Sequence, residues 1–254
     1  MYIIDYCPAC HSKDITKSPY KLSQFVAWRS TGDFPYGQVP TMGIKCNQCS
    51  FLATHHRLTA QEEQNLYINY RGDDYNKMRL FIEPQYQHHI TTFDGNDYAE
   101  KRKVGINALI NKNIDLSTVH SVLDYGGDTG AHIPQVFVNA KKYVYDISGV
   151  DTIEGVETYD TATSPATVDF LMCCHTLEHK SDPDILINDL KKYVDQSTWV
   201  YIEVPNADPP WQNEFHEHIN IFNCKSMTAL LERHGFKIAD VFENENLCML
   251  AKLK

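Results

Sequence analysis

Residues 122–130 read Val-Leu-Asp-Tyr-Gly-Gly-Asp-Thr-Gly, an apolar segment that leads directly into a glycine-rich turn. Sixteen residues after Gly130, the stretch Tyr-Val-Tyr-Asp-Ile-Ser predicts a second strand that ends on Asp146. A strand, a glycine turn, a helix and a second strand closed by an acid form a nucleotide-type pocket at the carboxyl edge of a parallel sheet. This order indicates that the chain binds an adenosine-bearing small molecule.

The chain around this segment alternates between strand and helix patterns. Helices are expected over about 98–112, 130–139, 184–194 and 226–234, and strands over 119–124, 143–146, 155–159, 168–174, 199–204, 236–242 and 247–253. The last two strands are joined by the short turn 243–246, so they must be antiparallel. We therefore predict an α/β fold with a doubly wound, Rossmann-like sheet that is closed by an antiparallel hairpin.

The composition limits the function classes. The chain has 254 residues, of which 43% are hydrophobic, enough for one full core and a smaller appendage. The net charge of −10 argues against a nucleic-acid partner, because phosphate binding needs clustered Lys and Arg. Neither a long apolar stretch nor a signal-peptide pattern is visible, so we expect a cytoplasmic protein with no membrane partner. The sequence does not indicate an oligomeric state.

Two Cys-x-x-Cys pairs lie near the N-terminus, Cys7 with Cys10 and Cys46 with Cys49. Two such turns supply the four thiolates of a tetrahedral zinc site, with redox dithiols or disulfides as the alternative. Since the protein would supply all four ligands, the predicted zinc is structural. The other cysteines lie in apolar runs and are expected to be small buried residues: Cys173, Cys174, Cys224 and Cys248.

Three units are expected along the chain. They are a four-cysteine zinc-binding module over 1–58, a helical lid or linker over 59–97, and a cofactor-binding domain over 98–254. Residues 11–45, between the cysteine pairs, are expected to form a small sheet of their own.

Within the linker, residues 60–83 look helical, with a possible hinge at Gly72. Aromatic and guanidinium side chains recur there every four residues, so they would share one stripe of a helix: Tyr67, Arg71, Tyr75 and Arg79. Such a stripe suits a lid that stacks on an adenine or grips an anionic substrate. The alternative is a helix whose tyrosine rings pack on the zinc module.

The glycine turn, the closing hairpin and the later His175-Thr-Leu-Glu-His179 resemble a class I S-adenosylmethionine-dependent methyltransferase over roughly residues 98–254. The four-cysteine module combined with Phe215-His-Glu-His-Ile-Asn-Ile-Phe222 is similar to the sugar C-methyltransferases of deoxysugar biosynthesis and to methyltransferases of surface-polysaccharide pathways. The resemblance implies S-adenosylmethionine as cofactor and a small methyl acceptor, a sugar or related metabolite of carbohydrate biosynthesis, methylated on carbon or oxygen.

Seven residues are expected to bind the cofactor: Asp124, Gly126, Gly127, Gly130, Asp146, Cys174 and His175. Asp146 would accept hydrogen bonds from both ribose hydroxyls, the alternative being a helix N-cap beside Ser148. The three glycines would let the backbone approach the methionine portion, while Asp124 orients the loop. Cys174 and His175 end the fourth strand, where the ammonium group of the cofactor and the substrate meet.

The resemblance also implies three catalytic residues: His218, Glu217 and His179. A carboxylate beside an imidazole can bring the imidazole pKa toward neutrality, so His218 would act as the general base with Glu217 as its orienter. The alternative is a pair that positions substrate or structure. His179 is an active-site imidazole or a buried residue that caps the next helix. His216 is a candidate substrate contact, and no third ligand for a second metal ion is evident beside it.

The leading hypothesis is therefore methyl transfer in which zinc takes no chemical part. The alternative is a non-catalytic binding or scaffold protein on a degenerate methyltransferase fold. Asp128 favours this alternative, because it stands where the usual turn Asp-x-Gly-x-Gly-x-Gly has a glycine. A nicotinamide dehydrogenase is disfavoured, since the glycines do not read Gly-x-Gly-x-x-Gly and the sheet ends in a hairpin.

Overall fold

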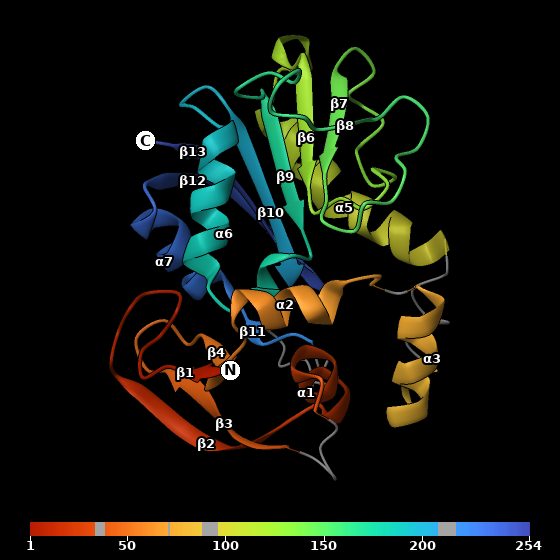
Figure 1. Cartoon of the computed structure of the whole chain (residues 1–254). Coiled ribbons are helices and arrows are strands. Elements are labelled where there is room, and N and C mark those ends of the chain that lie inside the picture. Colours follow the sequence, from red (N-terminus) through yellow and green to blue (C-terminus); the bar gives the residue numbers. More distant parts are fainter. Residues whose placement is uncertain (34–38, 71, 88–95, 208–216) are drawn as a thin grey trace.

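The computed structural model describes residues 1–33, 39–70, 72–87, 96–207 and 217–254. A large sheet with flanking helices lies beside a smaller N-terminal unit, which contains a four-stranded and a two-stranded sheet, and the two units are in direct contact (Figure 1). Within the described residues, no helix combines the length and apolar character that a membrane span needs.

The large sheet has the strand order β12-β13-β10-β9-β6-β7-β8. Its strands are β6 (Ser121–Tyr125), β7 (Lys141–Tyr145), β8 (Glu157–Thr158), β9 (Phe170–Cys174), β10 (Trp199–Pro205), β12 (Phe236–Glu243) and β13 (Asn246–Leu253). From β8 to β10 all neighbours pair in parallel, whereas β13 is antiparallel to both β10 and β12. The predicted sheet with a closing hairpin is confirmed.

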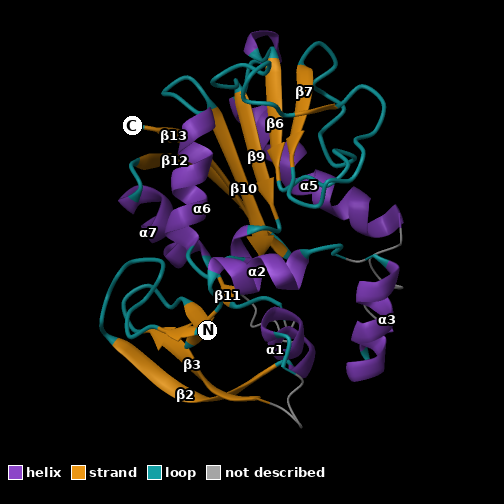
Figure 2. Cartoon of the chain, viewed as in Figure 1, coloured by secondary structure: helices purple, strands orange, loops and turns teal. Residues whose placement is uncertain are grey.

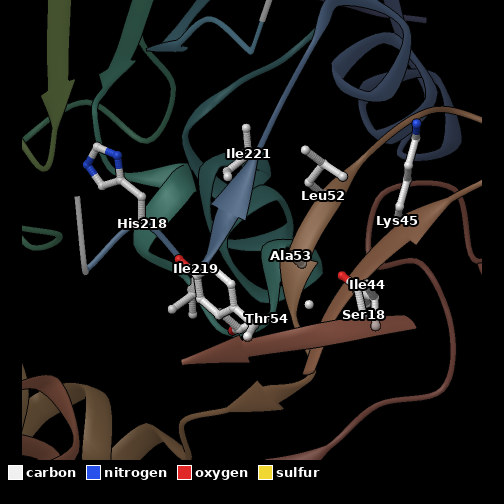
Figure 3. Close-up of a pocket in the computed structure, with 11 residues that line it drawn as sticks. Ser18, Ile44, Lys45, Leu52, Ala53, Thr54, His218, Ile219 and Ile221 are labelled. Carbon is white, nitrogen blue, oxygen red and sulfur yellow. The ribbon is translucent and has the colours of Figure 1, made fainter. Parts of the chain in front are cut away.

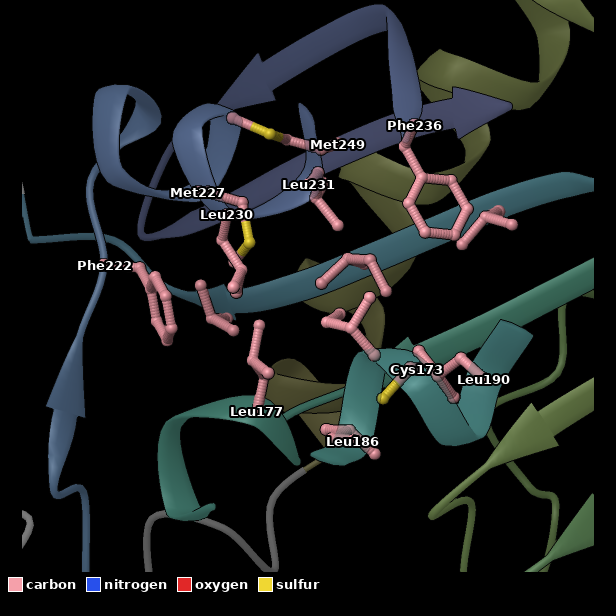
Figure 4. Close-up of a cluster of buried hydrophobic side chains, with 14 of the residues drawn as sticks. Cys173, Leu177, Leu186, Leu190, Phe222, Met227, Leu230, Leu231, Phe236 and Met249 are labelled. Atoms are coloured by element: carbon pink, nitrogen blue, oxygen red, sulfur yellow. The ribbon is translucent and has the colours of Figure 1, made fainter. Parts of the chain in front are cut away.

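Helices cover the two faces of this sheet unequally (Figure 2). Side chains of α5 (Asn96–Asn113) pack with one face, and those of α6 (Pro183–Leu190) and α7 (Cys224–Arg233) pack with the other. Figure 4 shows the second of these clusters, in which Leu186 of α6 and Leu230 of α7 approach the sheet. Successive strand residues point to opposite faces, so Phe170 belongs to the first cluster and Leu171 to the second. Short 3₁₀ turns are η1 (Leu116–Thr118), η2 (Leu177–His179) and η3 (Lys191–Tyr193).

The helix predicted over 130–139 is wrong, because this segment is a series of turns. Its backbone bonds join residues three apart, such as Ile133 N–H to the Gly130 carbonyl at 3.2 Å and Phe137 N–H to the Pro134 carbonyl at 3.3 Å. Pro134 has no N–H to donate and disfavours a helical conformation at Ile133. Ile133 and Phe137 nevertheless reach the core beside α5.

The helical character expected over 60–83 is confirmed, but as two helices, α2 (Ala60–Tyr67) and α3 (Asp73–Ile82), so the continuous stripe on one helix is wrong. Helix α2 begins with a capping box, in which Thr59 and Glu62 exchange side-chain and backbone hydrogen bonds. Gly72 is the N-cap of α3. Tyr67 therefore lies on a different helix from Tyr75 and Arg79, and Arg71 falls outside the described residues.

The N-terminal region contains the expected small sheet, with an unexpected member. Its elements are β1 (Tyr2–Ile3), β2 (Ile15–Leu22), α1 (Gln24–Thr31), β3 (Val39–Cys46), β4 (Leu52–Thr54) and β5 (His56–Arg57). Strand β1 pairs with β5, and the second sheet has the order β11-β4-β3-β2. Its edge strand is β11 (Asn220–Ile221), which belongs to the part of the chain predicted as the cofactor-binding domain, residues 98–254. The segment that follows His218 is therefore part of the N-terminal sheet.

Candidate functional site

The four predicted metal-ligating cysteines come together at one point. The Sγ atoms of Cys7 and Cys49 are 3.6 Å apart, and those of Cys10 and Cys46 are 3.5 Å apart. An ion held tetrahedrally by bonds of about 2.3 Å places its sulfur ligands roughly 3.8 Å apart, so the cluster fits zinc closely. Both turns share one geometry, since the residues after the second cysteine of each pair, His11 and Ser50, have positive φ of 60° and 61°.

Arg233 fastens this cluster to the large sheet. From α7, its Nε and Nη2 atoms each donate to a carbonyl of the first cysteine turn, those of Ala9 and Pro8, at 3.1 Å. Its Nη1 donates to Asp184 of α6 at 3.0 Å. Burial disfavours ionisation of Asp184, but hydrogen bonds from Arg233 and His234 hold its pKa below the ordinary value. The cysteine cluster is thus held against two helices of the larger unit.

The glycine turn packs closely against side chains of neighbouring residues, so two of its glycines have no room for a Cβ atom. A Cβ atom at Gly127 would lie 2.3 Å from the Asp124 carboxyl carbon, and one at Gly126 would lie 2.5 Å from Thr176 Oγ1. Gly126 also has φ of 76°, where side chains are strained. Asp128 has a positive φ of 53°, which aspartate tolerates better than most residues. The turn therefore keeps its shape despite the aspartate at a glycine position.

Asp146 joins the end of β7 to this turn. Its Oδ2 accepts the Asp128 N–H at 2.9 Å, and its Oδ1 accepts the Ser148 N–H at 2.7 Å. No helix begins there among the described residues, so Asp146 is not a helix N-cap. Each carboxylate oxygen has more than one acceptor direction, so both can also receive a ribose hydroxyl. The predicted position of Asp146 beside the glycine turn is confirmed by the geometry.

His175 stands directly after β9, between two buried carboxylates. Its Nε2 lies 3.0 Å from Glu203 Oε1 at the end of β10, and its Nδ1 lies 3.3 Å from Glu178 Oε1. His175 has a positive φ of 51°, and its N–H donates to the Glu203 carbonyl at 2.9 Å. The preceding Cys174 packs in the core. Asp124, Glu178 and Glu203 thus place buried acidic groups at the edge where a cationic cofactor is expected.

His179 and His218 form an imidazole pair next to these groups. Their ring centroids are 4.7 Å apart with an angle of 74°. His179 Nδ1 lies 3.1 Å from the Tyr67 hydroxyl and 3.3 Å from the carbonyl oxygen of Glu217. Burial, and then the neighbouring His179, lower the pKa of His218 to about 3. The neighbouring Glu178 and Glu217 raise this pKa but are outweighed, so the ring is neutral at pH 7 and the expected pKa near neutrality is wrong.

Glu217 turns its carboxylate away from this pair. It accepts a hydrogen bond from Tyr75 at 2.8 Å and forms an ion pair with Arg79. Burial opposes its ionisation, but Arg79 and Tyr75 lower the pKa of Glu217 to about 2. The Glu217 carboxylate is thus engaged by two side chains of α3.

The same contacts indicate whether Tyr75 and Arg79 face a substrate or pack inside the protein. Both are almost fully buried, and the Arg79 guanidinium lies over the rings of Phe25 and Tyr86, at 4.6 Å and 4.4 Å from their centroids. This arrangement favours packing against the N-terminal module over a substrate-gripping surface. His216 falls outside the described residues.

Arg57 holds the two histidine-bearing loops together from β5. It is fully buried and donates to the carbonyl oxygens of Ser181 at 2.9 Å, Ile219 at 2.9 Å and Lys180 at 3.2 Å. It also donates to the side-chain oxygen of Asn220. Burial lowers the pKa of Arg57 to about 10, which leaves the guanidinium charged at neutral pH. Sequence reasoning missed Arg57 and Glu178, although Glu178 stands beside the predicted His179.

A cavity of about 220 Å³ lies on the small sheet, next to the backbone of this loop. Residues from β2, β3, β4 and β11 line it, together with His218 and Ile219. In Figure 3 the His218 ring projects away from Ile44, Thr54 and Ile219. The His218 ring is therefore directed away from the labelled sheet residues, although His218 itself is part of the cavity lining.

The sheet order, the antiparallel β13 and the acid after β7 define a class I S-adenosylmethionine-dependent methyltransferase. A family model described as a methyltransferase domain matches residues 98–241, so the chain belongs to this family. The chain is 26% identical over 149 residues to the C-methyltransferase NovU of Streptomyces niveus, a match to 50% of this chain and 35% of that enzyme. The match thus spans about a third of the length of that relative.

Among solved structures, the chain is similar to an S-adenosylmethionine-dependent methyltransferase from Aquifex aeolicus. The TM-score is 0.51 at 19% identity, over 66% of this chain and 98% of the other. At this identity the likeness establishes the fold. It agrees with the strand order described above.

Replacing Asp146 by Ala is expected to weaken S-adenosylmethionine binding by at least about 10- to 150-fold, since even one hydrogen bond to a charged acceptor contributes about 1.5–3 kcal/mol. Isothermal titration calorimetry with the cofactor and with S-adenosylhomocysteine measures this change. Asp151→Asn, on the exposed segment just beyond, is the control and should bind like the wild type. Unchanged affinity in the Asp146 variant would remove this residue from the ribose site.

Proposed function

We propose that this methyltransferase transfers the methyl group of S-adenosylmethionine to carbon or oxygen of a small acceptor, a sugar or related metabolite. One observation carries the proposal: the glycine turn packs directly on the loop that carries the imidazoles. A Cβ at Gly126 would overlap Thr176, three residues before His179. The cofactor turn and the imidazole pair therefore share one edge of the sheet, as methyl transfer to an activated acceptor requires.

When bound, S-adenosylmethionine supplies a methyl group already activated by its sulfonium. Asp146 holds the ribose, and the buried acids Asp124 and Glu203 suit the positive charges of the cofactor. Neutral His218 takes the proton of the acceptor, from a hydroxyl or from a carbon beside a carbonyl. Glu217 orients His218 by anchoring its loop on Tyr75 and Arg79.

Tyr67 and His179 complete the acceptor side of this site. The Tyr67 hydroxyl contacts His179, whose ring packs edge-on against His218. Burial, and then the charge of Glu217, hold the pKa of Tyr67 well above its usual value, so the phenol stays protonated. We propose that these two side chains position the acceptor next to His218.

We further propose that the four cysteines bind one zinc ion and that residues 1–58 form a module around it. The sulfur separations of 3.5 Å and 3.6 Å support this assignment. Four protein thiolates leave no position for substrate, so the ion stabilises the fold. Residues 59–97 connect this module to the methyltransferase domain over 98–254.

His218→Gln is expected to lower kcat by about 100-fold or more, as removal of a general base commonly does. The assay is transfer of isotope-labelled methyl to a panel of nucleoside-diphosphate keto sugars and their hydroxyl counterparts. Cofactor affinity should stay within about twofold of the wild type, because His218 lies on the acceptor side. The exposed His120→Gln serves as control. A folded, zinc-loaded protein that binds no cofactor would instead support the scaffold alternative.

A further inference from the structure

Glu178 is a buried carboxylate that the mechanism above does not use. Its residue is 1% exposed, and its Oε1 lies 3.3 Å from His175 Nδ1. The Nε2 atoms of His179 and His218 are each 3.9 Å from the same oxygen. Within the described residues, both oxygens of Glu178 are shielded from solvent, and His175 is the side chain that hydrogen-bonds to it, at a long distance and with poor geometry. Three imidazoles thus surround one acid.

The charge of the Glu178 carboxylate determines how it acts on the three imidazoles. An ionised carboxylate in a low-dielectric site is costly unless positive charge lies close by. His175 is shared with a second buried acid, since Glu203 lies 3.0 Å from its other ring nitrogen. The remaining groups that face Glu178 are His179 and His218, whose Nε2 atoms point toward it. Lys180, next in sequence, is paired with Glu63 instead.

We propose that Glu178 is a positioning residue that stabilises the imidazolium formed when the His179–His218 pair takes the proton of the acceptor. The inference rests on the proposed function and deepens it. In the step, the acceptor O–H or C–H bond breaks and its electron pair forms the bond to the methyl carbon. The carbon–sulfur bond breaks toward sulfur, which releases S-adenosylhomocysteine, and the proton stays on imidazole beside Glu178.

The tautomer of His179 is consistent with this role. Its Nδ1 lies 3.3 Å from the Glu217 carbonyl oxygen, which can only accept a hydrogen bond, and 3.1 Å from the Tyr67 hydroxyl, which can accept one as well as donate. With the proton on Nδ1, the lone pair of Nε2 faces Glu178 and His218. A proton that arrives on either Nε2 is therefore placed directly against the carboxylate.

Glu178, His179 and His218 also have ligand atoms of the types that hold metal ions. Bonds of about 2.1 Å would separate the ligand atoms by roughly 3.0–3.4 Å. The two separations of 3.9 Å are wider than that. The cysteine cluster, in contrast, already has the spacing of its ion. The separations around Glu178 exceed those of adjacent ligands but not the roughly 4.2 Å between opposite ligands of an octahedral ion, so a cation site is the competing outcome of the test below.

The test compares Glu178→Gln, which removes the charge, with Glu178→Asp, which keeps it. Histidine ¹⁵N NMR of the full-length, zinc-loaded protein with S-adenosylhomocysteine follows the pH at which the imidazole pair takes up its first proton. The Gln variant should shift this midpoint down by about one pH unit or more, a tenfold loss of proton affinity. The Asp variant should stay near the wild type. This measurement needs no acceptor, so it separates the inference from the proposed function.

The kinetic arm uses a nucleoside-diphosphate keto sugar as acceptor. The Gln variant should lower kcat by roughly 10- to 100-fold with the KM of the cofactor within about twofold, and Asp should restore part of the rate. Glu232→Gln, an exposed acid on α7 outside the cluster, is the control. An unchanged proton midpoint in Glu178→Gln would overturn the inference. So would a rate that rises with added Mn²⁺ and depends on Glu178, which would establish a cation site.

Discussion

Cys46→Ser is expected to release the bound zinc and to lower the free energy of unfolding by at least about 3–5 kcal/mol, because metal binding to such sites is coupled to folding. Cys46 ends β3 and is almost fully buried, and its Sγ accepts the Cys49 N–H at 3.5 Å. Serine cannot replace the thiolate as a ligand of comparable strength. Metal content by mass spectrometry and the thermal midpoint of unfolding measure the two effects.

The matched control is Cys224→Ser, which changes a partly buried cysteine outside the cluster. It should keep one zinc ion per chain and lose less than about 1 kcal/mol of stability. Treatment of the wild type with a reductant alone should leave stability unchanged, since thiolate ligands need no disulfide. Equal stability and zinc content in Cys46→Ser and wild type would exclude a structural zinc site.

Arg57→Met is expected to lower the free energy of unfolding by about 3–5 kcal/mol, because each buried acceptor left unpaired costs about 1–3 kcal/mol. Methionine has a similar length but no donors, so the carbonyls of Lys180, Ser181 and Ile219 would lose their partner. These carbonyls flank His179 and His218. Activity should therefore fall even at temperatures where the variant remains folded.

Arg29→Met provides the comparison, because Arg29 is a partly exposed arginine that donates to one backbone carbonyl, that of Ile68, at 2.6 Å. Its expected cost is below about 1 kcal/mol. Urea unfolding measured by circular dichroism gives both values. If Arg57→Met unfolds at the same urea concentration as Arg29→Met, the buried hydrogen bonds of Arg57 contribute little to stability.

The sheet could be predicted because its signals are local. Apolar runs end at Asp124 and Asp146, and the hairpin follows from two strands with a short turn between them. The helix over 130–139 is wrong because it follows from the strand–turn–helix order alone, whereas Pro134 and its effect on Ile133 decide the local conformation. The possible hinge at Gly72 is where α3 begins, and the separate direction of the two helices is set by contacts that the sequence does not show.

The site was predicted less completely, because its contacts cross long stretches of chain. The pairing of Glu217 with Arg79 joins residues 138 positions apart, so no local pattern in the sequence indicates it. No periodic pattern in the sequence marks Glu178. Its role depends on three histidines that two separate loops bring around it. The Cys-x-x-Cys spacing, by contrast, determines how the two thiols of each pair are oriented. All four cysteines of the cluster could therefore be predicted from the sequence.

Strand β11 has a consequence for protein engineering. The loop after His218 pairs with β4 through Asn220 and Ile221, while Phe222 forms a bridge to Asn206 beyond β10. A chimera that exchanges only the cysteine module for that of a relative would replace β4 and Arg57 but retain the loop that fits them. The exchangeable unit is therefore discontinuous, since residues 1–58 must be transferred together with residues 217–223. We expect a chimera that receives both segments to take on the acceptor preference of the donor protein.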